Sequence, residues 1–356
     1  MNNWVVIIMA AGMGARMRSS MPKVLHEVAG IPVITHVLRA ARSLDPASVY
    51  VVTAPSHRKV LFGLLGTGVS FIDQTSPLGT GDALATAVRA IPVSDDPIIV
   101  LNGDIPLLRA ESLRALATLH LDRSAVLTAI TASVPGEQVP SYGRLQRGAR
   151  GKPVSILEPG DGDPVHTSPV EINVGAYAID AGWAREEVPN LKLRSSGEYY
   201  VTDLVGRAVS GGKRVEILKV DDPDEGFGVN TKVELARAEK IMQDRLRTHW
   251  MLEGVTMLDP STTYIHGEVE IGSGVIIHPN TNLHGLTTIA DGCSVGPNAT
   301  IADSTIGQGS TIGASVVEGT LISDDVSVGP YCHLRTGTQL LGGVRIGSHV
   351  EIKNSV

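Results

Sequence analysis

Up to about residue 228, short apolar and β-branched runs alternate with stretches in which apolar residues recur at helical spacing. Strands are predicted at residues 4–9, 49–54, 97–104, 125–131, 172–179 and 214–220. Helices are predicted at residues 33–44, 81–91, 110–121 and 199–210. This alternation indicates an α/β domain with a mainly parallel sheet that helices cover on both faces.

A more polar stretch from Asn230 to Gly254 carries apolar residues at roughly helical spacing among charged ones. Glycine commonly ends helices, and Gly254 closes this pattern. The stretch is therefore predicted to be one long connecting helix. The expected organisation is a first domain at residues 1–228, the connecting helix at 229–254 and a second domain at 255–356.

Beyond residue 260 an aliphatic residue returns every six positions. The period has one shortened step before Ile306 and a longer break after Ile312, and glycine directly follows several of the aliphatic residues. A period of six fits neither a helix nor a simple array of hairpins. The positions are Ile265, Ile271, Ile277, Leu283, Ile289, Val295, Ile301, Ile306, Ile312, Ile322, Val328, Leu334, Leu340, Ile346 and Ile352.

This period is typical of hexapeptide repeats, in which three short strands and three tight turns close one triangular coil. The aliphatic residues would point inward and stack on those of the next coil, while glycine and asparagine would supply the turn conformations. A β-sandwich with coincidental spacing is the alternative. Fifteen matches across about 90 residues favour a β-helix.

The formal net charge of −7 leaves no basic surplus to neutralise a nucleic-acid backbone, which argues against nucleic acid as a partner. The apolar N-terminal run breaks at Gly12 and lacks the basic segment of a signal peptide. No apolar stretch reaches the roughly 18 residues of a membrane span. Cys293 and Cys332 match no metal-binding spacing and are interpreted as reduced thiols. We therefore expect a cytoplasmic protein that does not bind membranes.

The segment MAAGMGARMRSSMPKVLH, residues 9–26, follows the first predicted strand. Its small residues, Gly12 and Gly14 among them, let a ligand approach the backbone, and the following N–H groups can face phosphate oxygens. Arg16 and Lys23 add positive charge. Open parallel sheets bind ligands at this edge, so the segment is a candidate phosphate-binding loop. A purely structural turn is the alternative.

Two known glycine motifs do not fit this loop. Met17 stands where the dinucleotide-binding fingerprint requires a third glycine, and no acidic residue ends the strand predicted at residues 49–54. No part of the chain matches the P-loop pattern. The segment is therefore predicted to be a third kind of phosphate-binding loop, distinct from both of these motifs.

The sequence AAGMGARM…PKVLH resembles the signature of sugar-nucleotide pyrophosphorylases. With the hexapeptide pattern, it resembles one family in particular, the bifunctional N-acetylglucosamine-1-phosphate uridyltransferases (the GlmU family). The resemblance spans the whole chain and includes PLGTGDA, LNGDIPL, YGR, EINVGAY, GEYYVTDL and GVN. It implies a Rossmann-like nucleotidyltransferase domain followed by a left-handed parallel β-helix of hexapeptide repeats.

The resemblance implies Mg²⁺-dependent transfer of a uridylyl group from UTP to N-acetylglucosamine 1-phosphate, which gives UDP-N-acetylglucosamine and pyrophosphate for cell-wall and lipopolysaccharide precursors. The attacking phosphate is already an anion, so the enzyme needs no general base. Its task is to position two polyanions and to neutralise their charge. A homotrimer through the β-helix is also implied.

The resemblance also assigns roles to residues. Arg16, Lys23 and Asp104 are implied to be catalytic, and Asp104 and Asn230 to hold Mg²⁺. Gln74 with the loop after it is implied to read the uracil. The implied substrate-binding residues are Met9, Ala10, Ala11, Gly12, Lys23, Gln74, Gly79, Thr80, Asn102, Gly103, Asp104, Gly143, Glu158, Asn173, Tyr199, Thr202, Asn230, Arg335 and Lys353.

Several of these positions also have a plainer structural interpretation. Asp104 ends an apolar strand at the ligand-binding edge, but it could instead cap the next helix. Gln74 could be a solvated loop residue and Glu158 a surface carboxylate, and Tyr199 and Tyr200 could equally be core aromatics. Asn173 lies in an apolar strand and needs partners if buried, which a ligand would supply.

Two loop residues depart from the family pattern. Ala15 stands where threonine is usual, and Met13 stands where lysine is common. Ala15 thus lacks a hydroxyl near the phosphates, and Met13 lacks a possible positive charge. Neither change alters the path of the backbone. Altered affinity with retained chemistry is the expected effect.

The family's hexapeptide domain carries an acetyltransferase that makes N-acetylglucosamine 1-phosphate. Arg335 and Lys353 match residues that bind its sugar phosphate. The sequence ends at Val356, before the positions implied for the catalytic histidine and the acetyl-CoA contacts. Acetyl transfer is therefore not expected of these residues.

Three competing functions remain open at this point: a hexapeptide acyltransferase with a non-catalytic first domain, a non-catalytic assembly subunit, and a pyrophosphorylase for another sugar phosphate or nucleotide. The presence of Arg16, Lys23, Asp104 and Asn230 argues against the first two. The segments PKVLH and EINVGAY disfavour the third without excluding it.

Overall fold

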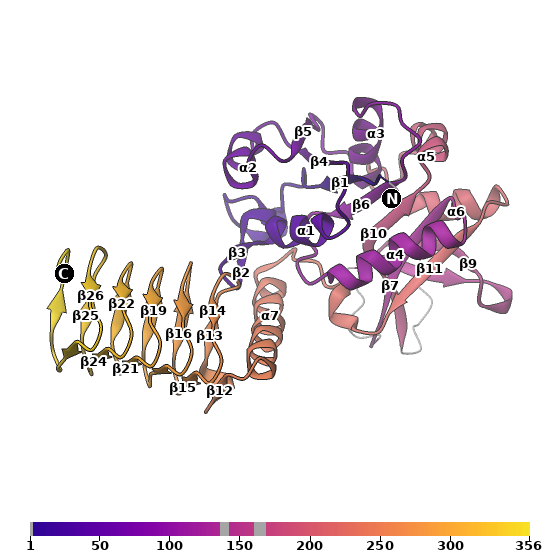
Figure 1. Cartoon of the computed structure of the whole chain (residues 1–356). Coiled ribbons are helices and arrows are strands. Elements are labelled where there is room, and N and C mark those ends of the chain that lie inside the picture. The colour runs from indigo at the N-terminus through magenta and orange to yellow at the C-terminus, as the bar shows by residue number, and fades with distance from the viewer. Residues whose placement is uncertain (1–2, 136–141, 160–168) are drawn as a thin grey trace. The chain divides into compact units, whose positions relative to one another are not determined.

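The computed structural model describes residues 3–135, 142–159 and 169–356 (Figure 1). The chain divides into two compact units, Met1–His26 with Pro32–Ala238 and Glu27–Ile31 with Glu239–Val356. The hydrophobic core of the β-helix is separate from the two cores that flank the sheet of the first unit. Each unit is described by itself.

The first unit is built on a nine-stranded sheet. Its strands are β1 (Val5–Met9), β4 (Ser48–Thr53), β5 (Ser70–Asp73), β6 (Ile98–Asn102), β7 (Leu127–Val134), β8 (Arg144–Arg147), β9 (Pro153–Leu157), β10 (Val170–Ile179) and β11 (Val215–Val220). The main order is β11-β7-β10-β6-β1-β4-β5, and β8 joins β9 to β10 (Figure 1). Neighbours on this path pair in parallel except at β10, which runs antiparallel to β6 and β7. The sheet is therefore mainly parallel, as predicted.

Helices cover both faces of this sheet. They are α1 (Val33–Arg42), α2 (Arg58–Leu65), α3 (Thr80–Ala90), α4 (Ala110–Asp122), α5 (Ala181–Glu187) and α6 (Asp203–Ser210). Successive residues of a strand point to opposite faces. Val6 and Ile8 of β1 accordingly join the core with α1, α2 and α4, whereas Val5 and Ile7 join the core with α3, α5 and α6.

The structure contains every strand and helix that the sequence pattern predicts, with ends displaced by a few residues. The largest displacement is at α6, which begins at Asp203 instead of at Tyr199. Sequence analysis missed α2, β5, α5 and the β8–β9 hairpin. These elements are short, and β5 and β8 carry polar or half-buried side chains that give no clear apolar pattern.

Short elements complete the description. The two-residue strands β2 (Glu27–Val28) and β3 (Ile31–Pro32) pair with each other. The 3₁₀ helices are η1 (Ala15–Met17), η2 (Lys23–Leu25), η4 (Ala149–Gly151), η5 (Val188–Asn190), η6 (Pro223–Gly226) and η7 (Pro260–Thr262). The predicted connecting helix is α7 (Lys232–Leu252).

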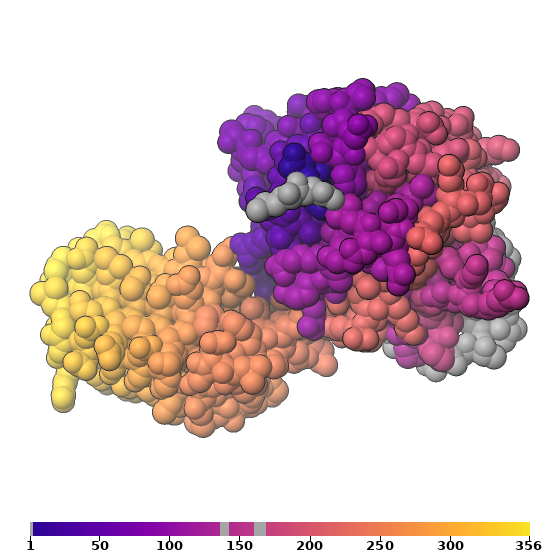
Figure 2. Space-filling view, turned by 45° about the vertical axis from the view of Figure 1, so that its right-hand side comes forward, coloured from indigo at the N-terminus to yellow at the C-terminus, as the bar shows by residue number. Residues whose placement is uncertain are grey.

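The second unit contains three parallel sheets of six, six and five short strands. Its stacked coils run in order of residue number from orange to yellow (Figure 2). The strands are β12 (Thr256–Met257), β13 (Tyr264–Ile265), β14 (Glu270–Ile271), β15 (Ile276–Ile277), β16 (Asn282–His284), β17 (Thr288–Ile289), β18 (Ser294–Val295), β19 (Thr300–Ala302), β20 (Thr305–Ile306), β21 (Thr311–Ile312), β22 (Val316–Glu318), β23 (Leu321–Ile322), β24 (Ser327–Val328), β25 (His333–Leu334), β26 (Gln339–Leu340), β27 (Arg345–Ile346) and β28 (Glu351–Ile352). This is the predicted β-helix, and it is consistent with the left-handed type.

The aliphatic residues of the six-residue period stack on one another. Ile265, Leu283, Ile301, Val317 and Leu334 follow one another in register along one sheet. Val317 was not part of the predicted period, and it fills the break after Ile312. The break in the period therefore consists of two shortened steps, and the inward-facing position between Ile312 and Ile322 is still occupied.

The turns place non-glycine residues in the left-handed conformation, among them Asn280 (φ 60°) and Asn298 (φ 54°). Asparagine tolerates this conformation better than most residues. The Asn280 amide donates to Asn298 Oδ1 at 3.1 Å, one coil further along. The predicted role of asparagine in the turns is therefore observed.

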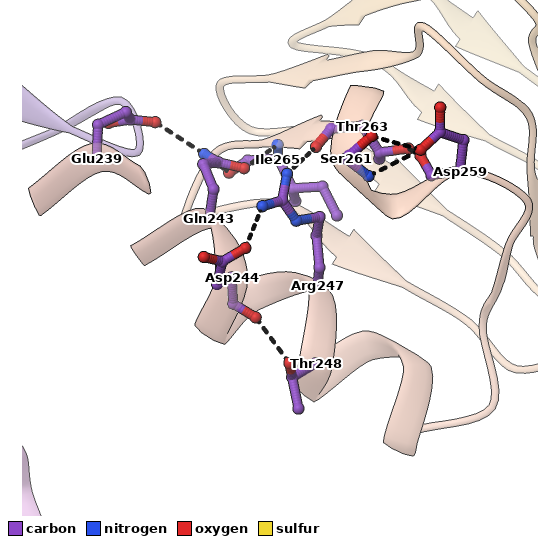
Figure 3. A network of polar contacts seen from close by, with 9 residues as sticks. All are labelled: Glu239, Gln243, Asp244, Arg247, Thr248, Asp259, Ser261, Thr263 and Ile265. Carbon is purple, nitrogen blue, oxygen red and sulfur yellow. Dashed lines mark hydrogen bonds and ion pairs between the residues drawn. The ribbon is translucent and has the colours of Figure 1, made fainter. Parts of the chain in front are cut away.

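Side chains of α7 pair with the edge of the first coil (Figure 3). The Gln243 amide accepts from the Ile265 N–H at 2.9 Å and donates to the Ile265 carbonyl oxygen at 2.8 Å. Arg247 donates to the Thr263 carbonyl oxygen at 3.0 Å. An exposed strand edge invites unwanted pairing, so these contacts close the edge of β13 as another strand would.

No helix among the described residues is long and apolar enough to cross a membrane.

Candidate active site

The first unit holds a cavity of about 520 Å³ at the carboxyl ends of its parallel strands. Met9 ends β1, Asn102 ends β6 and Gln74 directly follows β5, and all three line the cavity. Open α/β sheets bind ligands at this edge. The cavity therefore lies where the sequence predicted a ligand site.

The loop after β1 forms one wall of the cavity and depends on glycine. Gly14 has φ +66°, and a Cβ atom at this position would lie 2.8 Å from the Lys23 Cβ atom. Any side chain there would be strained and would displace Lys23. Arg16 lies on η1 and Lys23 on η2, and both line the cavity. The loop thus brings both predicted cations to the site.

The Lys23 ammonium joins two distant parts of the chain. It donates to a carboxylate oxygen of Asp104, at close range, and to Asn230 Oδ1 at 3.0 Å. The side chains of Lys23 and Asp104 are only 17% and 13% exposed, so water screens this pair weakly. Asp104 and Asn230, which lie 126 positions apart in the sequence, therefore direct their oxygens at one point.

These two oxygens suit a hard divalent cation. Mg²⁺ prefers oxygen ligands and is usually bound by one or two carboxylates together with substrate phosphates. The Lys23 ammonium shows that a cation fits between Asp104 and Asn230. No group of three or more His, Cys, Asp or Glu side chains able to hold a metal occurs among the described residues. Substrate oxygens would have to supply further ligands.

Gln74, Gly79 and Thr80 also line the cavity. Gln74 is 4% exposed, and its amide donates to an Asp82 carboxylate oxygen at 2.6 Å and to the Gly79 carbonyl oxygen at 3.3 Å. Thr80 begins α3, and its hydroxyl accepts from the Val201 N–H at 3.1 Å. Gln74 is therefore a buried, oriented amide, in contrast to the solvated residue that the sequence left as an alternative.

Glu158 and Thr202 contact each other in the lining of the cavity. The Thr202 hydroxyl donates to Glu158 Oε1 at 2.5 Å, and both residues line the cavity. A Cβ atom on Gly143 would lie 3.3 Å from Glu158 Oε1. A carboxylate held in this way can still accept hydrogen bonds from a ligand hydroxyl.

Asn173 has protein partners. Its amide donates to Tyr177 Oη at 2.6 Å, its Oδ1 accepts from the Gly175 N–H at 3.3 Å, and its backbone N–H donates to the Gly143 carbonyl oxygen at 2.8 Å. Burial raises the pKa of Tyr177, so its phenol stays protonated. The need for partners that the sequence raised is thus met within the protein, and Asn173 still lines the cavity.

Comparison with known proteins matches residues 6–154 to the MobA-like NTP transferase domain. The chain is 39% identical over its full length to the bifunctional protein GlmU of Streptococcus agalactiae serotype V, of which it covers 77%. It is 40% identical over 98% of its length to GlmU of Carboxydothermus hydrogenoformans, of which it covers 77%. It is 39% identical over 98% of its length to GlmU of Streptomyces coelicolor, of which it covers 73%.

The chain belongs to the GlmU family. It is a nucleotidyltransferase, and its family supports the synthesis of UDP-N-acetylglucosamine. Enzymes of this kind generally use a divalent metal, which agrees with the oxygen pair of Asp104 and Asn230.

In this GlmU-family structure, fifteen of the residues to which the resemblance assigned a role line one cavity. They are Met9, Ala11, Gly12, Arg16, Lys23, Gln74, Gly79, Thr80, Asn102, Asp104, Gly143, Glu158, Asn173, Thr202 and Asn230. The Asn102 Oδ1 atom is buried and has no hydrogen-bond partner among the described residues. The cavity therefore retains an acceptor that a ligand could use.

Five of the residues singled out do not line this cavity. Ala10 belongs to the core on the α1 face, and the Gly103 N–H donates to the Met9 carbonyl oxygen at 2.9 Å. Tyr199 packs against the other core, as its plainer interpretation expected. Arg335 and Lys353 belong to the β-helix, where Arg335 pairs with Glu351 at 3.0 Å.

The cavity also has lining residues that the sequence analysis did not assign. Tyr142, Tyr177, Glu198 and Tyr200 are among them. Burial raises the pKa of Tyr142 as well, so both phenols keep their protons. Tyr142 and Tyr177 lie within the YGR and EINVGAY segments, so the resemblance could have pointed to both residues. Tyr200 follows directly after Tyr199, and only the backbone direction shows which of the two faces the cavity.

Proposed function

We propose that this GlmU-family chain transfers a uridylyl group from UTP to N-acetylglucosamine 1-phosphate, with Mg²⁺ as its cofactor. One observation carries the proposal: Lys23, Asp104 and Asn230 meet beside the glycine loop that follows β1. This combination offers both a cation and oxygen ligands next to backbone N–H groups, which is what a triphosphate requires.

The chemistry requires position and charge rather than a nucleophilic side chain. A phosphate oxygen of the sugar phosphate forms a bond to the α-phosphorus of UTP, and the bond from that phosphorus to the bridging oxygen of the β-phosphate breaks. Arg16 and Lys23 would neutralise charge on the pyrophosphate that leaves. Bound Mg²⁺, held by Asp104 and Asn230, would offset phosphate charge in the same region.

Substrate selection is proposed to depend on two groups of polar residues that line the cavity. The buried Gln74 amide, with Gly79 and Thr80, would read the uracil edge. Glu158 and Thr202 would accept and donate hydrogen bonds at the sugar. Fixed polar groups of this kind reject a ligand that leaves them unpaired.

The test measures pyrophosphate release with N-acetylglucosamine 1-phosphate and each of the four common nucleoside triphosphates, with and without Mg²⁺. We expect release with UTP that chelation of the metal abolishes. Glucose 1-phosphate serves as the matched acceptor that lacks the N-acetyl group. Faster release with this acceptor or with another triphosphate would replace the proposal by a pyrophosphorylase of different specificity.

Other expectations remain predictions. These are the three-part division at residues 228 and 254, the homotrimer, the cytoplasmic location and the binding of a sugar phosphate by Arg335 and Lys353. Sedimentation analysis of the chain at several concentrations would test the trimer.

A further inference from the structure

A short loop, residues 222–230, forms the wall of the cavity that carries Asn230. Gly226, Gly228 and Asn230 line the cavity, and η6 lies within the loop. The Val229 N–H donates to the backbone carbonyl oxygen of Asp104 at 2.8 Å. The position of Asn230 beside Asp104 therefore depends on how this loop is attached to the segment that follows Asp104.

Glu225 makes the buried part of that attachment. It is 2% exposed, and both of its carboxylate oxygens are used. Oε2 accepts from the Arg109 N–H at 2.9 Å, and Oε1 accepts from the Ser112 hydroxyl at 2.9 Å. Arg109 and Ser112 lie at the start of α4, which begins at Ala110, six positions after Asp104.

Glu225 acts as an N-terminal cap supplied by a distant segment. Arg109 occupies the N-cap position of α4, and its own side chain makes no cap bond. The Arg109 guanidinium instead pairs with Asp222, at the beginning of the same loop, at 2.6 Å. The first N–H groups of a helix need acceptors, and the helix dipole favours a carboxylate there.

The burial of Glu225 makes this attachment specific. A buried carboxylate is costly unless hydrogen bonds compensate it, so the loop is stable only where both donors of α4 are met. The exposed pair of Arg109 and Asp222 adds little by comparison, because water screens it. The two hydrogen bonds of the Glu225 carboxylate therefore fix the loop at one position. Apolar contacts in their place would allow the loop to shift slightly.

We infer that Glu225 is a positioning residue for the divalent cation of this enzyme. It fixes the Asn230 loop to the start of α4, so that the oxygens of Asn230 and Asp104 converge on one cation. The inference rests on the proposed cation site. Glu225 does not line the cavity and is not proposed to touch substrate or metal.

The test compares Glu225→Ala with a matched loss of a helix cap elsewhere. Asp180 caps α5 by accepting from the Trp183 N–H at 2.7 Å and does not line the cavity, so Asp180→Ala is the control. Both variants lose a cap, which costs about 0.5 to 2 kcal/mol of stability. Thermal unfolding of each variant measures the two losses, which are expected to be comparable.

The decisive measurement is binding of Mn²⁺ to the enzyme–UTP complex, followed by water-proton relaxation. We expect Glu225→Ala to need about tenfold more Mn²⁺ for half-saturation, because the lost bonds involve a charged group. The Mg²⁺ concentration for half-maximal pyrophosphate release should rise in parallel. Asp180→Ala should leave both within about twofold, since it removes a cap of the same kind away from the site.

Two milder variants keep the test decisive if Glu225→Ala does not fold. Glu225→Gln retains an acceptor for the Arg109 N–H, and Ser112→Ala removes one of the two bonds. Each should shift the Mn²⁺ requirement by about threefold, on the scale of one hydrogen bond. An unchanged Mn²⁺ requirement in the Glu225 and Ser112 variants, with wild-type enzyme responding normally to the metal, would overturn the inference. If wild-type enzyme showed no metal-dependent binding or release, the proposed function itself would fail.

Discussion

Hydrogen bonds of the β-helix and of the cavity span very different lengths of chain. Asn280 bonds Asn298, 18 positions away, and paired residues of successive coils lie 16 to 18 positions apart. Lys23 bonds Asp104 and Asn230, which are 81 and 207 positions away. A residue in the β-helix thus meets its equivalent in the next coil, whereas a residue in the cavity meets a partner of different chemistry.

Because of this difference, a single substitution should have different effects in the β-helix and in the cavity. An inward residue of the β-helix has apolar neighbours on both sides, so its loss is a packing loss spread along the stack. The Asp104 carboxylate pairs with the Lys23 ammonium and is proposed to bind the metal. Its loss therefore leaves these positive charges without a partner. The β-helix should therefore lose stability with unchanged chemistry, whereas the cavity should lose chemistry.

The largest expected effect is on β-helix stability. Ile301 is fully buried and pairs with Leu283 and Val317 in the adjacent coils. Ile301→Ala should lower the free energy of unfolding of this unit by about 2 to 5 kcal/mol, because it removes a core side chain and leaves a cavity. Hydrogen exchange localised to residues 256–352 measures the loss.

The matched control for Ile301→Ala is Thr300→Ala, which alters the outward-facing neighbour in the same strand. It should change stability by less than about 0.5 kcal/mol. The kcat for pyrophosphate release should stay unchanged in both variants, since all the described residues that line the cavity belong to the first unit. A large drop in kcat for Ile301→Ala at temperatures where it is folded would break the division between the two regions.

The next effect in size is the loss of turnover in Asp104→Ala. Turnover should fall by at least about a hundredfold, on the scale of losing one charge-stabilising group, and Lys23 would lose its counter-ion. Steady-state pyrophosphate release gives the change, and thermal unfolding shows whether the fold persists. Asp122→Ala, at the exposed end of α4, is the control. Near-normal turnover of the Asp104 variant would remove this residue from the proposed metal site.

The smallest effect concerns the edge where α7 meets the first coil. Gln243 is 2% exposed, and its amide is the partner of both Ile265 backbone groups. Gln243→Ala should cost about 1 to 3 kcal/mol, because buried backbone groups lose their partners. Faster exchange of the Ile265 amide would report the loss. Thr248→Ala, which removes a hydroxyl that donates to the Asp244 carbonyl oxygen of its own helix, should leave that amide protected.

Several features were predictable because they repeat or follow a local pattern. The period from Ile265 to Ile352 predicted the β-helix, since stacked coils require an inward residue at each repeat. The strand–helix alternation predicted the layers of the first unit, and the glycine loop predicted which sheet edge holds the cavity. Val317 was missed because two shortened turns hide it from a strict period of six.

Other features depended on contacts that leave no local pattern. The antiparallel direction of β10 follows from how it inserts between β6 and β7, and its apolar sequence is compatible with either direction. Which of Tyr199 and Tyr200 faces the cavity depends on the backbone path before α6. The buried Glu225, in a stretch of acidic residues, resembles any surface carboxylate in the sequence.

The amino-acid sequence by itself determined the repeat architecture, the layered α/β unit, the family and the residue types of the site. These follow from side-chain periodicity and short motifs, which act over a few residues of chain. The resemblance implied that Asp104 and Asn230 hold one metal, and the tertiary structure adds that the Lys23 ammonium contacts both of them and that Glu225 caps α4. Such contacts join segments that lie from about 80 to more than 200 positions apart in the sequence. Local sequence propensity does not predict which distant segments come together.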